Sequence, residues 1–295
     1  MIYLLPALLL LLQSVITVHT ELVVVPVVVT DASGGHVGGL AQDNFQIYED
    51  GRLRPVTAFH HGEASITMGL IVDRSQSMRP KTPALLAAVS ALLNSIRKDD
   101  ELFAVDFSDH VSVELPADHP FTNDPKALRA QLLTVRADGQ TALYDGVAEG
   151  LRQLQSGHGQ RHALVVISDG GDNVSRLKYA DVLALARQSD AVIYAIGLLG
   201  DSPVEEEEDS GLLKRLCKDT GGVAYFPRTA EEIASASRQV ADDLREQYTL
   251  GFEPAERTDA RAFRKIEVRV TAAGAGRLHV RTRSGYLAAG ASAKP

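Results

Sequence analysis

The sequence is poor in several residue types, and each shortage excludes a class of protein. It has no Trp and a single Cys among 295 residues, so a framework of intramolecular disulfides is impossible. Its formal net charge is −8, and no stripe of Lys and Arg is interleaved with aromatic residues. This argues against a nucleic acid as the main partner. Hydrophobic residues still make up 45% of the chain, which is enough for a sizeable core.

The one cysteine, Cys217, lies at helical spacing from Leu213. It can be interpreted as a small buried apolar residue or as a catalytic thiol. We favour the buried residue, because Cys217 shares helical spacing with Leu213 and free cysteine is usually buried.

The N-terminus carries an apolar run that includes five consecutive leucines at residues 8–12. It is too short for a comfortable transmembrane helix and is typical of the core of a signal peptide. However, no Lys or Arg precedes it and no A-x-A cleavage site follows, so an uncleaved membrane anchor stays open. We expect residues 1–20 to be a signal peptide or anchor, and the protein to be exported to the periplasm, the cell surface or the medium.

Strand patterns occupy both ends of the chain. Residues 22–30 are β-branched, and Pro26 predicts an edge position. Residues 45–48 and 56–59 flank a hairpin turn at Glu49-Asp50-Gly51. Strand character returns at residues 248–252, 263–271 and 278–282.

Neither end has enough strands to be stable alone. We therefore expect residues 21–62 and 246–287 to pair as one small β-sandwich, followed by a disordered tail at 288–295. Because chain ends of compact domains often lie close together, a second domain can be inserted between the two halves of such a sandwich.

Residues 65–245 alternate between buried strands and amphipathic helices, a pattern that predicts an α/β domain with a doubly wound, mostly parallel sheet. Strands are predicted at 68–72, 102–107, 111–115, 163–167, 191–196 and 223–226, and helices at 83–96, 126–133, 142–154, 180–187, 211–218 and 231–246. The five acidic residues at 205–209 read as a solvated loop before a helix.

Three polar segments follow predicted strands or precede predicted helices. They are Asp73-Arg74-Ser75-Gln76-Ser77, Gly139-Gln140-Thr141 and Ser168-Asp169-Gly170-Gly171-Asp172. Ligand sites in open α/β sheets gather at the carboxyl ends of the strands, so these segments should meet. They offer carboxylate and hydroxyl oxygens without His or Cys, which suits a hard divalent cation. Each segment alone is also explained by a turn or a helix cap, and Asp172 is more readily a cap than a ligand.

The order Asp73-x-Ser75-x-Ser77, Thr141 and Asp169 resembles the metal-ion-dependent adhesion site (MIDAS) of von Willebrand factor type A domains, and residues 166–170 resemble that family's fourth strand. The resemblance spans residues 65–245. It implies a doubly wound sheet with one antiparallel edge strand, and a metal contacted by the two serines and the threonine and bound by both aspartates. It also implies Mg²⁺ as the first choice, with Mn²⁺ or Ca²⁺ as alternatives, and a protein partner that supplies an acidic residue.

Around this site we expect a ligand-binding rim of Arg74, Gln76, Gln140 and Gly170. The family usually has a small residue where this chain has Gln76, and often Thr where it has Arg74, so both put the metal affinity in question. The flanking residues 22–31, 44–51, 247–252 and 283–286 are similar to exported proteins of the same family from Acidobacteria.

Two other functions remain open. A scaffold domain with a structural metal would show metal-dependent stability without a metal-dependent ligand. A Mg²⁺-dependent phosphoryl-transfer hydrolase of the haloacid dehalogenase type also starts from an Asp after a first strand, but it needs a second carboxylate two residues later. This chain has Ser75 there. We therefore expect a binding module without catalytic residues.

Overall fold

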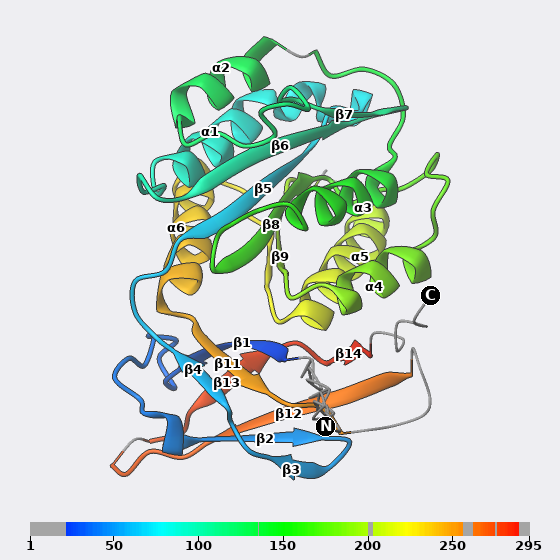
Figure 1. Cartoon of the computed structure of the whole chain (residues 1–295). Helices are drawn as coiled ribbons and strands as arrows, with labels where there is room; N and C mark the ends of the chain where they lie inside the picture. The colour runs from blue at the N-terminus through cyan, green and yellow to red at the C-terminus, as the bar shows by residue number, and fades with distance from the viewer. Residues whose placement is uncertain (1–21, 135, 200–202, 256–261, 275, 289–295) are drawn as a thin grey trace, which may run out of the picture.

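A computed structural model describes residues 22–134, 136–199, 203–255, 262–274 and 276–288. Figure 1 shows an α/β domain above a part made only of strands. The predicted leader at residues 1–20, and the predicted tail from residue 289 on, lie outside the described residues. Within the described ranges, no helix combines the length and the apolar character needed to cross a membrane.

The α/β domain is built on a six-stranded sheet whose order is β10-β9-β8-β5-β6-β7. Its strands are β5 (Ile66–Asp73), β6 (Glu101–Phe107), β7 (Val111–Val113), β8 (Arg161–Ser168), β9 (Val192–Gly197) and β10 (Ala224–Tyr225). All neighbours are parallel except β7, which pairs with β6 in the antiparallel sense. The predicted doubly wound sheet with an antiparallel edge strand is therefore confirmed.

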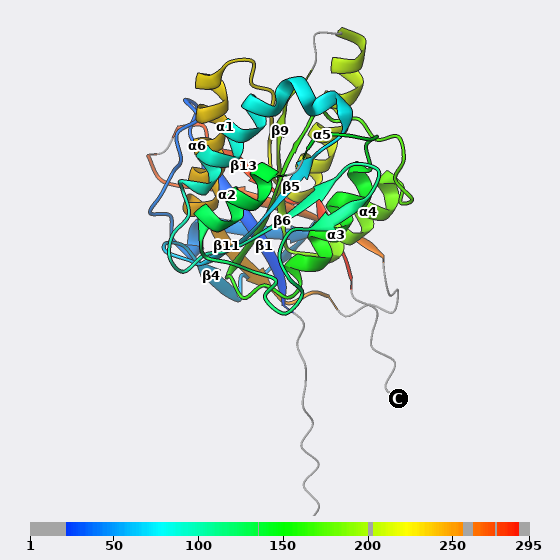
Figure 2. The same cartoon turned by 90° about the horizontal axis from the view of Figure 1, so that it is seen from above.

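Helices cover both faces of this sheet, as Figure 2 shows from above. On one face lie α1 (Thr82–Leu93), α2 (Pro125–Thr134) and α6 (Ala230–Glu246), and on the other lie α3 (Leu143–Leu154), α4 (Tyr179–Gln188) and α5 (Pro203–Thr220). Successive side chains of a strand point to opposite faces, so Leu70 joins one core cluster and Ile71 the other. A continuous apolar run is what a strand buried on both faces requires.

Helix α5 begins earlier than the sequence pattern predicts. The acidic run at 205–209 was expected to form a loop, but the structure places it in the first turns of α5. Pro203 fits the first position of a helix, Glu is a good helix former, and negative charge is favourable near the positive end of the helix dipole. These local preferences outweigh the lack of apolar periodicity in the run.

The all-β part is a sandwich of two four-stranded antiparallel sheets. The first has the order β13-β1-β11-β4 and contains β1 (Val23–Thr30), β4 (Ala58–His60), β11 (Tyr248–Phe252) and β13 (His279–Thr282). The second has the order β14-β12-β2-β3 and contains β2 (Phe45–Glu49), β3 (Arg52–Arg54), β12 (Phe263–Val270) and β14 (Gly285–Leu287). Each sheet takes strands from both ends of the chain, which confirms the predicted insertion. One shared core, with Phe45, Tyr248 and Ile266, joins them.

Two expectations for the N-terminal strands are wrong. Strand β1 lies inside its sheet rather than at an edge. Pro26 has no N–H to donate to a neighbouring strand. It is tolerated because the pairing of β1 with β13 starts only at Val27, and the Pro26 carbonyl accepts the hydroxyl of Thr282. The strand that returns from the Asp50-Gly51 turn is β3, not residues 56–59. A two-residue turn sets Arg52 directly opposite Glu49, and the later strand β4 crosses to the other sheet.

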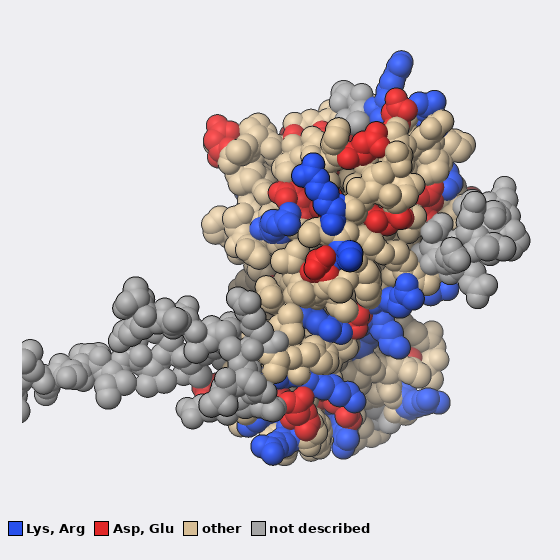
Figure 3. Space-filling model, turned by 90° about the vertical axis from the view of Figure 1, so that its right-hand side faces the viewer, with Lys and Arg blue, Asp and Glu red and all other residues tan. Residues whose placement is uncertain are grey.

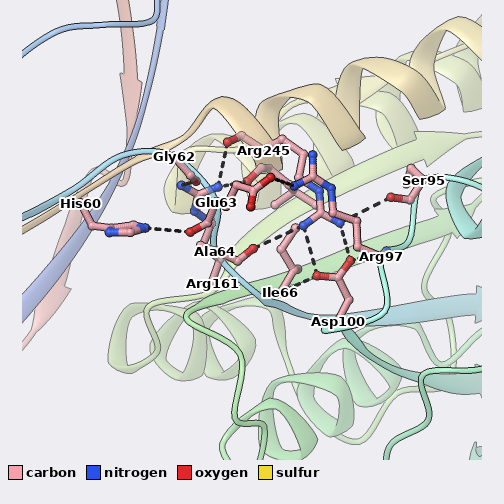
Figure 4. Close-up of polar contacts among 11 residues, drawn as sticks. His60, Gly62, Glu63, Ala64, Ile66, Ser95, Arg97, Asp100, Arg161 and Arg245 are labelled. Atoms are coloured by element: carbon pink, nitrogen blue, oxygen red, sulfur yellow. Dashed lines mark hydrogen bonds and ion pairs between the residues drawn. The ribbon is translucent and has the colours of Figure 1, made fainter.

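Arg161, at the start of β8, joins the α/β domain to the sandwich (Figure 4). Its guanidinium donates to the carbonyls of Leu244 and Arg245 at the end of α6, at 2.7 and 2.9 Å. It also donates to the carbonyls of Gly62 and Gln247, at 3.1 and 2.7 Å, where the chain enters and leaves the sandwich. Burial lowers the pKa of Arg161 to about 10, so it remains charged at neutral pH. Both connections between the two parts are thus held by one side chain.

Charged side chains of both signs are interspersed on the face of the molecule shown in Figure 3. Lys and Arg gather around the level where the α/β domain meets the sandwich, with Asp and Glu among them. This face therefore lacks the continuous basic surface that a nucleic-acid backbone would require.

Candidate metal site

The three polar segments meet at the carboxyl end of the parallel sheet. The first follows β5 and runs into the 3-10 helix η2 (Gln76–Lys81), the second precedes α3, and the third follows β8. Strand β5 lies between β6 and β8, so the chain reverses its direction of winding there. Such a switch point is where α/β sheets form ligand crevices.

Asp73 ends β5 and is fully buried. Its Oδ1 accepts the backbone N–H of Ser75 at 2.8 Å, and its Oδ2 accepts the hydroxyl of Ser168 at 2.5 Å. Burial raises the pKa of Asp73 to about 6, with a smaller contribution from the nearby charge of Asp169, while the hydrogen bonds from Ser168 and Ser75 oppose the rise. A cation beside this carboxylate would favour its ionised form.

The hydroxyls of Ser75 and Ser77 lie 3.0 Å apart. Ser75 occupies the N-cap position of η2, but its side chain makes no capping hydrogen bond. The local turn is closed instead by the Asp73 carboxylate on the Ser75 amide. The turn or cap interpretation therefore accounts for the Asp73 carboxylate and the Ser75 amide but not for the Ser77 hydroxyl, which bonds only to that of Ser75 among the described residues.

Thr141 is buried at the start of α3 and is tied to the third segment. Its amide donates to Asn173 Oδ1 at 2.9 Å, and its carbonyl accepts the Asn173 amide at 2.9 Å. Its own hydroxyl has no hydrogen bond to another described residue. The second segment also reaches the first, because the Gln76 amide donates to the carbonyl of Gly139 at 2.9 Å.

Close packing of α3 on the sheet fixes the position of Thr141 relative to the strand ends. A Cβ on Gly150 would lie 2.4 Å from Ile71 Cδ1, and a Cβ on Gly146 would lie 2.8 Å from the ring of Phe107. Any larger residue at either position would push the helix, and the loop before it, away from the strand ends.

Asp169 follows β8 and reaches the first segment through an ion pair. The ammonium of Lys81, the last residue of η2, lies 2.9 Å from Asp169 Oδ2. The two side chains are 19% and 12% exposed. No other described residue makes a hydrogen bond with the Asp169 carboxylate. All three segments are thus connected pairwise, and one carboxylate at their junction already has a cation beside it.

The donor set fits a hard divalent cation. Its members are two carboxylates and three hydroxyls, those of Asp73, Asp169, Ser75, Ser77 and Thr141, and the ammonium at Asp169 shows that a positive charge is accommodated there. Within the described residues no group of three or more His, Cys, Asp or Glu could hold a metal. A transition-metal centre of that kind is therefore not found in the described part of the chain, whereas hydroxyl-rich oxygen donors favour Mg²⁺, Mn²⁺ or Ca²⁺.

The four predicted rim residues differ in exposure. Gln76 and Gln140 are exposed, and Gly170 is buried with φ +98° and its amide bonded to Ser168 Oγ. The expectation for Arg74 is wrong, because its side chain is buried and turned away from the rim. It donates to Asp106 Oδ2 at 3.1 Å and to the carbonyl of Leu132. A buried guanidinium needs such acceptors, and these lie behind the site rather than at its surface.

Three residues of the site were not identified as functional from the sequence. Ser168 orients Asp73, Asn173 fixes Thr141, and Lys81 pairs with Asp169. Ser168 could have been recognised from the sequence because it directly precedes Asp169. No sequence pattern around Lys81 indicates that it belongs to the site. Asp172 was expected to cap the segment that follows it; instead its Oδ1 accepts the Tyr144 amide at 3.2 Å, in the first turn of the preceding helix α3.

Cys217 is buried, as predicted, and burial raises the pKa of its thiol. It belongs to α5 and joins the core cluster between that helix and the sheet. A thiol held in its neutral form by an apolar environment is not a reactive nucleophile.

Comparison with known families supports the same fold. The family model of the von Willebrand factor type A domain matches residues 68–239. A search among curated proteins gives no significant match.

Among solved structures, a von Willebrand factor type A protein from Catenulispora acidiphila aligns with a TM-score of 0.52 and 12% identity, over 94% of this chain and 76% of that one. Proximal thread matrix protein 1 from the mussel byssus aligns with a TM-score of 0.51 and 15% identity, over 68% and 50% of the two chains. The pilus adhesin SpaC from Lactobacillus rhamnosus GG aligns with a TM-score of 0.50 and 11% identity, over 88% and 50%. At these identities the likeness is one of fold.

Proposed function

Because the chain belongs to the von Willebrand factor type A domain family, we propose that it is a binding module whose partner is held through a divalent metal, with Mg²⁺ as the first choice. Asp73, Ser75, Ser77, Thr141 and Asp169 would hold the ion. The observation that supports the proposal is the joining of the three segments that bear these five oxygen donors, with the hydroxyls of Ser75 and Ser77 3.0 Å apart beside the buried Asp73. A bound divalent ion would supply positive charge with an open coordination position.

The partner's contribution follows from the charge balance. Two carboxylates match the charge of a divalent ion, and neutral hydroxyls leave it electrophilic enough to accept one more carboxylate. We therefore propose a protein ligand that presents an Asp or Glu. The exposed Gln76 and Gln140 flank the place where this side chain would arrive.

Export belongs to the same proposal. The apolar run before residue 20 supports a signal peptide or an anchor, and a binding module of this kind would meet its partner in the periplasm, at the cell surface or in the medium. A pilus adhesin is among the proteins that share the fold. The shared fold by itself does not transfer adhesion to this chain, so the proposal rests on the donor set.

The test is a calorimetric titration of Mg²⁺, Mn²⁺ and Ca²⁺ into the EDTA-treated full-length chain. We expect saturation near one ion per chain, and loss of binding in the Asp73→Ala, Ser75→Ala double variant. Ser77→Ala removes one exposed hydroxyl and should weaken binding in a chain that still folds. Asp43→Ala, an exposed carboxylate in the sandwich, is the control and should bind as wild type.

A second experiment separates binding from scaffolding. A random peptide library is panned on the protein in Mg²⁺ and in EDTA, and enrichment of Asp- or Glu-containing peptides only in Mg²⁺ is the expected result. Saturable metal binding that raises the melting temperature, without any peptide enrichment, would favour a structural metal instead. Absence of metal binding in the folded wild type would overturn the proposal.

A further inference from the structure

We propose that Lys81 is a built-in cation of the metal site: its ammonium occupies Asp169 when no metal is bound and has to leave when a metal enters. This inference rests on the proposed metal site. It adds Lys81 to the residues that set the metal affinity. It also implies that the Lys81 side chain lies in different places in the metal-bound and metal-free states.

The first observation is the isolation of the pair. Lys81 Nζ lies 2.9 Å from Asp169 Oδ2, and no other described residue makes a hydrogen bond with that carboxylate. Asp73, in contrast, has its two oxygens held by Ser75 and Ser168. The metal-free site therefore has one carboxylate stabilised by hydroxyl and amide groups, and one stabilised only by a mobile positive charge.

The second observation is the burial of the pair. At 19% and 12% exposure, Lys81 and Asp169 are screened by little water. Arg79, on the same short helix, pairs with Asp138 at 3.0 Å, but those side chains are 57% and 79% exposed. An exposed pair of that kind contributes little. The attraction between Lys81 and Asp169 acts in a lower effective dielectric, and so does the repulsion between Lys81 and any second cation.

The third observation is that Lys81 has room to move. Its side chain also lines a hollow of about 180 Å³ beside the site. The walls of the hollow include the apolar side chains of Ala84, Leu198, Phe226 and Ile233, and Arg228 also lines it. A four-carbon stem can lie along such apolar walls while its ammonium turns to water. The ion pair can therefore open without a rearrangement of the backbone of η2.

Competition follows from these observations. A divalent ion at Asp169 would meet a like charge at hydrogen-bond distance, and both need the same carboxylate. Metal binding must break the ion pair, so the measured affinity is the intrinsic affinity reduced by the stability of the pair. Removing the ammonium removes this competition.

The test compares Lys81→Met with Arg79→Met in the full-length chain. Lys81→Met should bind Mg²⁺ at least about tenfold more tightly in calorimetric titration, because a buried like charge is removed. Its melting temperature in EDTA should fall, because Asp169 loses the one ion-pair partner that it has among the described residues. Arg79→Met should change neither quantity, and Lys81→Arg, which keeps the charge, should bind metal like wild type.

The opposite movement of the two quantities separates competition from a structural role. If Lys81 merely supported the loop, Lys81→Met would lower both the melting temperature and the metal affinity, and this result would overturn the inference. Unchanged affinity in Lys81→Met, with wild type binding metal, would also overturn it while the metal site stands. Binding by neither chain would overturn the inference together with the proposed function.

A readout in the wild type protects the test against a variant that fails to fold. The reactivity of the Lys81 amine toward an acylating reagent is measured by peptide mass mapping with and without saturating Mg²⁺. Reactivity at Lys81 should rise severalfold on saturation, while the exposed Lys98 stays constant. Equal reactivity at Lys81 in both states would overturn the inference.

Discussion

At the amino end of the α/β sheet, Arg161 donates to four backbone carbonyls, whereas at its carboxyl end Asp169 has a single lysine as its partner. Both ends bury charge beside the same central strands. At the amino end the charge is surrounded by fixed backbone acceptors from α6 and the sandwich. At the carboxyl end it is balanced by one flexible side chain, and the hydroxyls of Ser75 and Ser77 lie 3.0 Å apart nearby.

The comparison distinguishes a structural contact at the amino end of the sheet from a candidate binding site at its carboxyl end. Four hydrogen bonds hold the Arg161 guanidinium among backbone carbonyls, although its Nε has no hydrogen-bond partner in the described part of the chain. The amino end therefore holds the sandwich and the α/β domain in one arrangement, and the carboxyl end keeps the capacity to exchange one cation for another.

The largest effect is expected from Arg161→Met. The variant leaves the carbonyls of Leu244, Gly62 and Gln247 without their buried donor, so the free energy of unfolding should fall by about 3 kcal/mol or more. Urea denaturation measures this directly. Arg97→Met removes an exposed pair with Glu63 near the same joint and should cost at most about 1 kcal/mol. Equal losses in the two variants would show that Arg161 does not hold the joint.

Ser168→Ala tests the other end of the sheet. It removes the hydroxyl that holds Asp73 Oδ2, and loss of a partner that orients a ligand typically weakens metal binding by about tenfold or more. Because that hydroxyl also lowers the pKa of Asp73, the loss should be greater at pH 6 than at pH 8.

The measurement for Ser168→Ala is a Mg²⁺ titration by calorimetry at both pH values. Ser90→Ala is the matched control, since its hydroxyl donates to the carbonyl of Leu86 within α1 at 2.6 Å, away from the site. Wild-type affinity in Ser168→Ala at both pH values would mean that Asp73 is positioned without Ser168.

His162 and Asp190 give a smaller, pH-dependent effect at the amino end. His162 Nδ1 lies 2.8 Å from Asp190 Oδ1. The hydrogen bond to Asp190 raises the pKa of His162, although burial opposes it. Burial would raise the pKa of Asp190, but the hydrogen bond and charge of His162 bring it below its usual value.

The two shifts define a window of pH. A raised histidine pKa stabilises the fold below about 6.5, and that stabilisation is lost as the pH rises through the folded-state value. A lowered aspartate pKa stabilises the fold above about 4 and is lost in acid. His162→Gln should therefore cost about 1 kcal/mol at pH 5.5 and less at pH 9. His158→Gln, whose pair with Glu101 is exposed, is the control for urea denaturation at both pH values. A loss independent of pH would contradict the assignment.

More of the fold than of the candidate metal site can be predicted from the sequence. Alternating buried strands and helices define the sheet because the signal is local and periodic. Asp73, Ser75 and Asp169 can be recognised because each lies within three residues of the end of a predicted strand. The pair of Lys81 with Asp169 joins residues 88 positions apart, and no local pattern encodes it. Pro26 inside β1 and the acidic turns of α5 escape prediction because strand pairing and helix-end charge decide them.

Gln76→Gly is expected to have the smallest effect. Gln76 stands where the family usually has a small residue, and a bulky side chain there was expected to put the metal affinity in doubt. In the structure its side chain is exposed, and its backbone is not among the residues with positive φ. Its amide is already engaged by the carbonyl of Gly139 at 2.9 Å, a bond that glycine keeps. The affinity for Mg²⁺ should therefore change by less than about threefold, within the range of an exposed substitution. A tenfold gain in calorimetric titration would mean that the Gln76 side chain folds over the ion, and that the site is limited by steric access rather than by the ammonium of Lys81.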